Sequence, residues 1–169
     1  MRNMTKKLAL RVIFWGITVG IMVIVFLNSA KDATQSSEIS MSFTEQLFTV
    51  FIPDYGAMDE ASKLSLITEM QFFIRKSAHF LSYFAMGLFC TLAYNTHKLR
   101  LRNKFLFSAA TCVCFSVSDE IHQLFVPGRS GEIRDVLIDT AGILLAALTV
   151  TAIIYLSKRR KEKKNEKGL

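Results

Sequence analysis

The 169-residue sequence has little cysteine and little proline, with three and two residues respectively. Cys90, Cys112 and Cys114 all lie within apolar stretches. Cys112 and Cys114 are two positions apart and would therefore point to different sides of a helix. A disulfide or a metal site made from these residues is not expected. We interpret the three cysteines as small apolar side chains that fill the interior.

The sequence also lacks the motifs of several functional classes. Its formal net charge is +7, but it has no basic stripe with interleaved aromatic residues and no nucleic-acid-binding motif. It contains no cofactor-binding motif and no His-Glu-x-x-His pattern of a zinc site. Ser118 lacks the flanking glycines of a hydrolase nucleophile. We therefore predict no nucleic-acid partner, no cofactor and no metal.

Long hydrophobic blocks are what the sequence does contain. Hydrophobic residues make up 51% of the chain and are grouped in a way that indicates lipid as the surrounding solvent. Helices that cross a membrane are predicted near residues 12–28, 77–94, 105–121 and 136–156. The first block could instead be a signal peptide, but its length and Asn28 at its exit favour an uncleaved helix. The predicted fold is all-α, a polytopic membrane protein with about four transmembrane helices.

The basic residues predict how these helices are oriented. Fifteen of the 21 Lys and Arg residues lie before the first helix, in the 95–104 connector or after residue 156. The positive-inside rule places these three segments, and so both termini, in the cytoplasm. The predicted organisation is a membrane domain over residues 1–156 and a basic cytoplasmic tail over residues 157–169.

The first outer loop, about residues 29–74, is too long to be only a connector. An apolar helical stripe runs through Phe43, Leu47, Phe48 and Phe51, and Pro53 then ends it. A second stretch from residue 58 to residue 73 also mixes apolar and charged positions. We predict short amphipathic helices that lie along the interface or pack over the mouth of the bundle. A plain loop is the alternative.

Polar and charged residues gather at the predicted outer ends of three helices. Lys76, His79 and Tyr83 share a face of the second helix by their spacing. On the third helix, Asp119 and His122 share one face, while Glu120 and Gln123 share the neighbouring face. The remaining members of the cluster are Arg129 in a Pro-Gly turn and, at the start of the fourth helix, Asp135 and Asp139. Gly142 and Ala146 continue the Asp139 face and would let another helix approach closely.

Ionisable groups at membrane depth are costly unless they pair or line a polar cavity. The cluster therefore has two interpretations: salt bridges that tie the helix ends together, or an outward-facing pocket for a ligand. Histidine beside carboxylates would also suit acid–base catalysis. The candidate catalytic residues are His79, Asp119, Glu120 and His122. The pattern does not decide between an enzyme, a binding protein and a scaffold.

Three segments carry a family resemblance. They are FLNSAKDATQSSEIS (residues 26–40), RKSAHFLSYFAMG (residues 75–87) and SDEIHQLFVPGRSGEIRDVLIDTAG (residues 118–142). Their order and spacing resemble the VanZ-like family of bacterial membrane proteins. The resemblance extends over nearly all of the chain, leaving out the basic tail and part of the first loop. That family is named for a protein associated with low-level resistance to teicoplanin, a lipidated glycopeptide antibiotic.

The resemblance implies a small multi-helix membrane protein whose shared polar positions form its core. The matching positions are Lys76, His79, Tyr83, Asp119, Glu120, His122, Gln123, Arg129, Asp135 and Gly142. Asp139 stands where the family pattern leads us to expect Asn, which adds a carboxylate within the membrane. The resemblance also implies that serines of the first segment, such as Ser29, lie near the cluster.

The leading hypothesis is an envelope accessory protein whose outward pocket engages a lipid-linked cell-wall component or a lipoglycopeptide, and contributes to teicoplanin resistance. Lys76 and Arg129 would hold the anionic part of the ligand. The anionic part would be polarised or positioned by Asp119, Glu120 and His122, and Arg129 would be oriented by Asp135. The second hypothesis is an enzyme acting on a lipid-linked substrate with His122 or His79 as base. The third is a scaffold held by ion pairs. Membrane lipids are expected partners of all three, and the sequence defines no oligomeric state.

Overall fold

The computed structural model describes residues 2–166, and Met1 and the last three residues of the predicted tail lie outside this range. The described residues form five α-helices and one short 3-10 helix, with no strand among them. The helices are α1 (Arg2–Ser29), α2 (Ala33–Phe51), the 3-10 helix η1 (Tyr55–Ala57), α3 (Glu60–Asn95), α4 (Leu101–Gln123) and α5 (Ile133–Glu166). The predicted all-α class is therefore confirmed.

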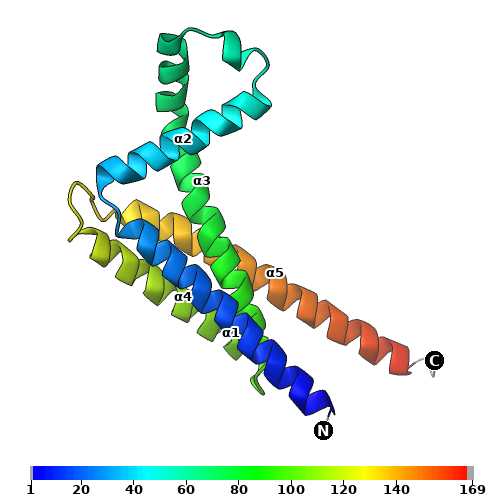
Figure 1. The fold of residues 1–169 in the computed structure, drawn as a ribbon. Helices are drawn as coiled ribbons and strands as arrows, with labels where there is room; N and C mark the ends of the chain where they lie inside the picture. The colour runs from blue at the N-terminus through cyan, green and yellow to red at the C-terminus, as the bar shows by residue number, and fades with distance from the viewer. Residues whose placement is uncertain (1, 167–169) are drawn as a thin grey trace.

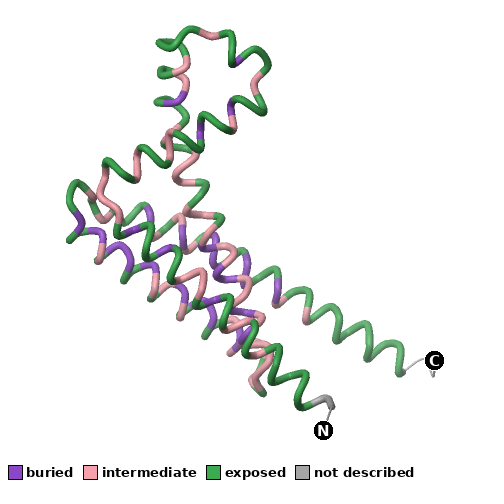
Figure 2. The backbone as a smooth tube through the Cα atoms, viewed as in Figure 1, coloured by how far each residue is buried: buried purple, intermediate pink, exposed green. Residues whose placement is uncertain are grey.

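Four of these helices form a bundle. α1, α4, α5 and the second half of α3 lie side by side, and α3 packs most extensively against α5 (Figure 1). Both described ends of the chain and the connector between α3 and α4 lie at the same end of this bundle. Tyr83, Met86, Cys90, Cys112 and Ile143 are fully buried in its interior. Most of the buried stretches of the chain lie within this bundle (Figure 2).

α2, η1 and the first half of α3 project from the opposite end of the bundle as an arm (Figure 1). Phe48, Tyr55 and Ile67 form a small buried core within it. α2 is helical as predicted and ends at Phe51, two residues before Pro53. The second amphipathic helix, predicted as a short separate helix, is instead the beginning of the 36-residue α3. No glycine or proline lies between Glu60 and Lys76, so nothing interrupts the helix there.

The helices extend beyond the apolar blocks that predicted them. α1 starts at Arg2 and α5 continues to Glu166, because Lys, Arg and Glu are good helix formers at solvent-exposed positions. Within α1 the segment Met4–Ser29, and within α5 the segment Ile133–Asn165, are long and apolar enough to cross a membrane. α3 and α4 carry more polar and charged side chains. Composition and length thus indicate a membrane protein with two such helices among the described residues, rather than the four predicted.

Small residues set the distance between α3 and α5, as the sequence predicted. A Cβ atom at Gly142 would lie 2.6 Å from the Phe80 carbonyl oxygen, and one at Gly87 would lie 3.0 Å from the Ile143 Cα. Ala146 is fully buried in the same contact. The interpretation of the cysteines as interior side chains holds for Cys90 and Cys112 and is wrong for Cys114, which is exposed.

Candidate functional site

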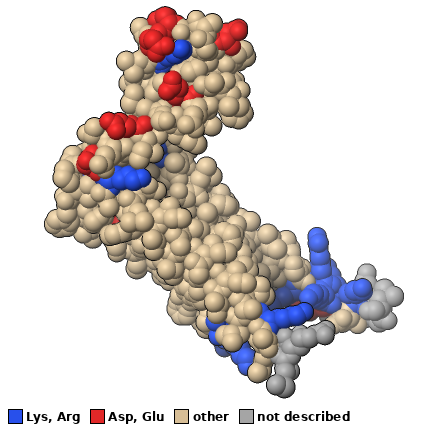
Figure 3. All heavy atoms as spheres, in the orientation of Figure 1, with Lys and Arg blue, Asp and Glu red and all other residues tan. Residues whose placement is uncertain are grey.

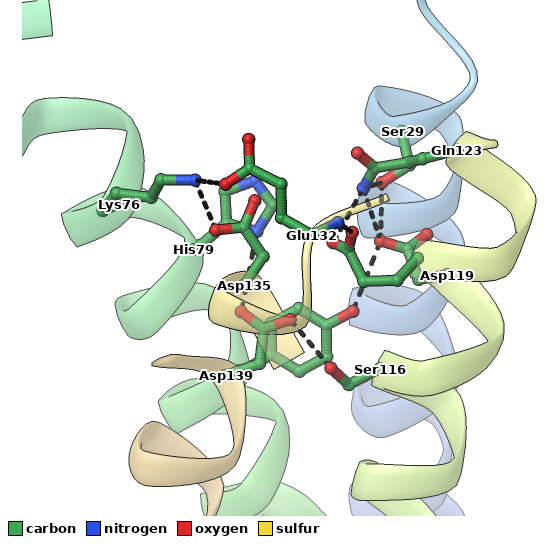
Figure 4. A network of polar contacts seen from close by, with 11 residues as sticks. Ser29, Lys76, His79, Ser116, Asp119, Gln123, Glu132, Asp135 and Asp139 are labelled. Atoms are coloured by element: carbon green, nitrogen blue, oxygen red, sulfur yellow. Dashed lines mark hydrogen bonds and ion pairs between the residues drawn. The ribbon is translucent and has the colours of Figure 1, made fainter. Parts of the chain in front are cut away.

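The polar cluster lies at the end of the bundle from which the arm projects, and α1, α3, α4 and α5 all contribute to it (Figure 4). Most of its members are buried. The buried residues are Ser29, Tyr83, Ser116, Asp119, Glu120, Gln123, Asp135 and Asp139. Buried polar groups are costly unless they are hydrogen-bonded, so the bonds within this cluster explain which helix ends are held together.

Asp119 on α4 is the centre of one half of the cluster. Its Oδ2 accepts a hydrogen bond from the Ser29 hydroxyl at 2.7 Å, and longer bonds of 3.4 Å from the Tyr83 hydroxyl and from Gln123 Nε2. Its Oδ1 is buried and has no hydrogen-bond partner among the described residues. These bonds join α4 to the end of α1 and to α3, and they place Ser29 in the cluster as the family resemblance implied.

Glu120 holds the loop that leads into α5. Its Oε2 accepts a hydrogen bond from the backbone N–H of Glu132 at 2.9 Å, and its Oε1 accepts one from Gln123 Nε2 at 3.2 Å. Gly131 lies in the same loop, where a Cβ atom would be 2.7 Å from the Glu120 carbonyl oxygen. The loop between α4 and α5 is therefore packed directly onto the end of α4.

Lys76 and Asp135 form an ion pair between α3 and α5. Lys76 Nζ also lies 3.5 Å from a carboxylate oxygen of Glu132. The Lys76 side chain is only 12% exposed and the Asp135 side chain 6%, so this pair is largely shielded from solvent. The predicted partnership of Asp135 with Arg129 is not seen, because Asp135 is turned towards Lys76 instead.

His79 and Asp139 form a second contact between α3 and α5. His79 Nδ1 lies 3.6 Å from Asp139 Oδ1, and the Ser116 hydroxyl donates to Asp139 Oδ2 at 2.8 Å (Figure 4). Asp139 is fully buried, whereas the His79 side chain is 21% exposed. The imidazole is thus oriented by a buried carboxylate and still reaches the surface of a cavity.

His122 lies apart from this network. Its ring stacks on Phe26 of α1 at a centroid distance of 4.5 Å. Its Nε2 is buried without a hydrogen-bond partner in the part of the chain that the structure describes. The predicted grouping of His122 with Asp119 is therefore not seen as a hydrogen bond, although the two residues are three positions apart on α4. Helical spacing gave the right face, but the ring is turned towards α1.

A cavity of about 350 Å³ adjoins the cluster between the end of α1, the start of α2 and the middle of α3. Its apolar wall is formed by Val25, Ile39, Phe43, Ile74 and Ala78. His79 and Tyr83 connect it to the buried network. Four serines also line it, namely Ser29, Ser36, Ser40 and Ser82.

Three basic side chains line this cavity: Lys31, Arg75 and Arg129. No carboxylate is among its lining residues in the described part of the chain. Arg129 is fixed by two backbone carbonyls, with Nε bonded to the oxygen of Lys31 and Nη2 to that of Asn28, both at 3.2 Å. Burial and the nearby charge of Arg75 lower the pKa of Arg129, so the surroundings disfavour its positive charge.

The sequence placed Arg75 among the cations of the cluster, but sequence analysis assigned the anion-binding role to Arg129 and to neither Arg75 nor Lys31. Lys31 lies two residues after the end of α1, in the Ser-rich segment 26–40. That segment carries part of the family resemblance, and this was the signal that could have identified Lys31. Lys76, the predicted partner of Arg129 in holding an anion, does not line the cavity. Among the described residues, no group of three or more His, Cys, Asp or Glu side chains is arranged to hold a metal ion.

Comparison with known proteins gives one match. The family model described as VanZ/LLP1 matches residues 14–155, which include parts of α1 and α5, all of α3 and α4, and every residue of the cluster. A search of curated proteins and a search of solved structures found no significant match. Because the family model covers most of the 169 residues, this chain belongs to the VanZ/LLP1 family.

Proposed function

We propose that this chain is a multi-pass membrane protein in which α1, α3, α4 and α5 all cross the membrane, near residues 12–28, 77–94, 105–121 and 136–156. Their side-by-side packing supports this arrangement (Figure 1). So do the exposed apolar side chains on the outer surface of the bundle, such as Val12, Val23, Leu144 and Leu148. α3 and α4 are more polar because they contribute the cluster, and polar groups turned to the inside of a bundle are shielded from lipid.

The distribution of charge supports cytoplasmic termini. Lys and Arg side chains gather at the end of the bundle where both described chain ends lie, while Asp and Glu are prominent on the arm (Figure 3). By the positive-inside rule the basic end faces the cytoplasm, which puts the arm and the cavity on the outer side. Residues 1–156 would then be the membrane domain and residues 157–169 a cytoplasmic tail.

The cavity on the outer side is proposed to engage an amphipathic anion, either a lipid-linked cell-wall component or a lipoglycopeptide antibiotic. The observation that carries this proposal is a cavity lined by the basic side chains of Lys31, Arg75 and Arg129 and also by several apolar side chains. A half-buried cation without a carboxylate partner is costly, and an anionic head group would supply the missing partner. Ile39 and Phe43 would contact the apolar part of the same molecule.

Membership of the VanZ/LLP1 family makes teicoplanin resistance a specific outcome to test. We would express the wild-type chain, Arg75→Gln and Arg134→Gln in a Gram-positive host and compare the inhibitory concentrations of teicoplanin and vancomycin. Arg134 is the matched control, since it is exposed on α5 and does not line the cavity. Immunoblots of membranes would establish equal protein levels.

Wild type and Arg134→Gln are expected to raise the teicoplanin concentration selectively, and Arg75→Gln is expected to lose most of that effect. A resistant Arg75→Gln strain would exclude the cavity as the site of the activity. If no strain differs from the empty vector, this chain confers no resistance in that host. The same variants would then be tested against endogenous lipid-linked substrates.

The contact between His79 and Asp139 favours a second candidate function, an enzyme acting on a lipid-linked substrate. A buried carboxylate next to Nδ1 orients the imidazole and stabilises its protonated form, which leaves Nε2 to accept a proton from a reacting group. His79 lines the cavity, whereas His122 does not. Of the two histidines that the sequence offered as a base, His79 is therefore the one placed next to a possible substrate.

Turnover separates the candidate functions. Purified protein in lipid nanodiscs would be incubated with a radiolabelled lipid-linked cell-wall precursor, and products would be separated by chromatography. An enzyme should form product at many molecules per protein, and His79→Gln should abolish this while the precursor still binds. Binding without product would support the accessory protein instead. If cluster variants lose stability and activity in proportion, the cluster serves only to hold the helix ends together.

A further inference from the structure

The three basic side chains that line the cavity form no ion pair with a described carboxylate. Lys31 Nζ is bonded only to the side-chain oxygen of Asn28, at 2.8 Å. Arg129 is bonded to two carbonyl oxygens and forms no ion pair with a described carboxylate, while Asp119, Glu120 and Asp135 favour its charge from a greater distance. Arg75 makes no hydrogen bond and no ion pair with any residue that the structure describes, and its charge disfavours that of Arg129. Three positive charges thus face one space without a carboxylate partner in the described lining.

A hydroxyl group in the same cavity also lacks a partner. Ser40 lines the cavity, and its Oγ is buried without a hydrogen bond among the described residues. The nearby Ser29 hydroxyl, in contrast, donates to Asp119. A buried hydroxyl without a partner is unusual in a folded protein, and a ligand oxygen within reach would satisfy it. This observation is independent of the charges and points to the same place.

We propose that the cavity selects lipids whose head group is a phosphate monoester or a pyrophosphate over lipids that carry one negative charge, with Arg75 as the specificity-determining residue. This proposal rests on the proposed function, because it takes the cavity as the ligand site. It goes further in naming the head group. Lipids of this kind would be held by the basic side chains and Ser40, with the hydrocarbon chain along the apolar wall.

The chemistry of the basic residues supports a phosphate. A guanidinium presents planar N–H donors that match phosphate oxygens in pairs, and Arg129 keeps donors available because two carbonyls use only some of them. A phosphate monoester carries about −1.5 to −2 charges at pH 7 and has three strong acceptor oxygens. It can therefore neutralise more of the three cations than a phosphodiester or a carboxylate with a single charge.

The apolar side of the cavity gives the hydrocarbon chain a way out. Ile39 and Phe43 on α2 are 51% and 52% exposed. Both residues line the cavity and also a shallower groove on the outer face of α2, where Glu38, Ser42 and Gln46 join them. A chain that starts beside Arg75 can continue over these two side chains without displacing any helix. The cavity therefore suits the head group and the first carbons of a longer molecule.

The test compares two lipids with the same chain. Full-length protein in dodecyl maltoside would be titrated with oleoyl lysophosphatidic acid, a phosphate monoester, and with oleoyl lysophosphatidylglycerol, a phosphodiester. Native mass spectrometry would count the bound lipids. We expect the monoester to bind about tenfold more tightly, in line with one additional charge-assisted interaction. Inorganic phosphate should compete only weakly, since it lacks the chain that contacts the apolar wall.

Variants identify the residue that discriminates. Arg75→Gln should reduce monoester binding about tenfold, change phosphodiester binding much less, and so remove the preference. Arg75→Lys should restore part of it, because it keeps the charge and loses the planar donors. Arg134→Gln should leave both affinities unchanged, and Ser40→Ala should weaken the monoester several-fold. Thermal unfolding of each variant would establish that it is folded.

The outcomes separate this inference from the proposed function. Equal binding of both lipids, reduced equally by Arg75→Gln, would overturn the phosphate preference and leave an anion-binding cavity. No binding of either lipid, or binding that Arg75→Gln does not change, would overturn the cavity as the ligand site and with it both proposals. Competition by inorganic phosphate at the affinity of the monoester would mean that the free ion, and not a lipid, is the ligand.

Discussion

Substitution of Gly142 by alanine should separate α3 from α5. The added Cβ atom would lie 2.6 Å from the Phe80 carbonyl oxygen and 3.1 Å from the Phe84 nitrogen, and both of these are backbone atoms that no side-chain rotation can move. Ordinary van der Waals contact begins near 3.4 Å. The two helices, which pack together more extensively than any other described pair, must therefore move apart by about 0.8 Å, or the backbone must bend.

The magnitude follows from two opposing effects. Overpacking of a well-packed interior costs about 1–3 kcal/mol. Replacement of glycine by alanine inside a helix returns up to about 1 kcal/mol through helix propensity. Gly16 on α1 is the matched control, because a Cβ atom there meets nothing within 4 Å. Gly16→Ala should therefore be neutral or stabilising, and the difference between the two variants isolates the steric cost of the helix crossing.

The assay is thermal unfolding of the full chain in a mild detergent. The measured quantity is the fraction of protein that remains in the monodisperse chromatographic peak after heating. Gly142→Ala should lower the midpoint by several degrees relative to Gly16→Ala. Gly87→Ala, whose Cβ atom would lie 3.0 Å from the backbone of Ile143, should act in the same direction. Equal midpoints for Gly142→Ala and Gly16→Ala would refute the inference that backbone contact at this crossing limits side-chain size.

Two further predictions concern hydrogen bonds that α1 makes to other parts of the chain. Ser29→Ala removes the 2.7 Å hydrogen bond to the buried Asp119 and should lower the unfolding free energy by about 1–3 kcal/mol. Ser36→Ala is the control, because the Ser36 side chain makes no bond to a described residue, and it should change the unfolding free energy little. Equal losses in the two variants would contradict a stabilising role for the Ser29 hydrogen bond. In the middle of α1, the only tryptophan, Trp15, donates its indole N–H to Nε2 of His97 at 3.3 Å, which requires neutral His97. Burial and neighbouring basic side chains lower the pKa of His97. As the pH falls from about 6.5 towards that lower pKa, the unfolded chain binds a proton that the folded protein does not, so the folded protein should lose stability. The emission of Trp15 should change over the same range. His97→Gln should remove this titration, and an emission curve that titrates equally in both proteins would contradict the assignment.

Much of the bundle could be predicted from apolar blocks, but the arm could not. Hydrophobic periodicity identified α2 and placed its end before Pro53. It gave no reason to join residues 58–73 to the next helix, because the stretch is amphipathic while the block after it is apolar. The continuity of α3 depends on the absence of a helix-breaking residue between the two parts. Such an absence is visible in the sequence, yet it is a weaker signal than a change in polarity.

The composition of the cluster could be predicted better than its pairings. Helical spacing correctly placed Lys76, His79 and Tyr83 along α3, but spacing does not say which neighbouring helix each side chain meets. Lys76 points to α5 and pairs with Asp135, while the adjacent Arg75 lines the cavity beside α2. Successive residues of a helix differ in direction by about 100°, so one position decides between an ion pair and a ligand site.

The sequence left two interpretations of the cluster open, ion pairs that hold the helix ends together and a ligand pocket. In the structure, one set of residues joins the helix ends and a different set lines the cavity. The carboxylates are already engaged: Asp135 with Lys76, Glu120 with the backbone of Glu132, and Asp119 with Ser29. These contacts join helix ends and need no ligand. The cations of the cavity form no ion pair with a carboxylate among the described residues. Substitutions of the first group should therefore act on stability, and substitutions of the second on binding. A stability loss in Arg75→Gln as large as that in Ser29→Ala would mean that the cavity also serves to hold the helix ends together.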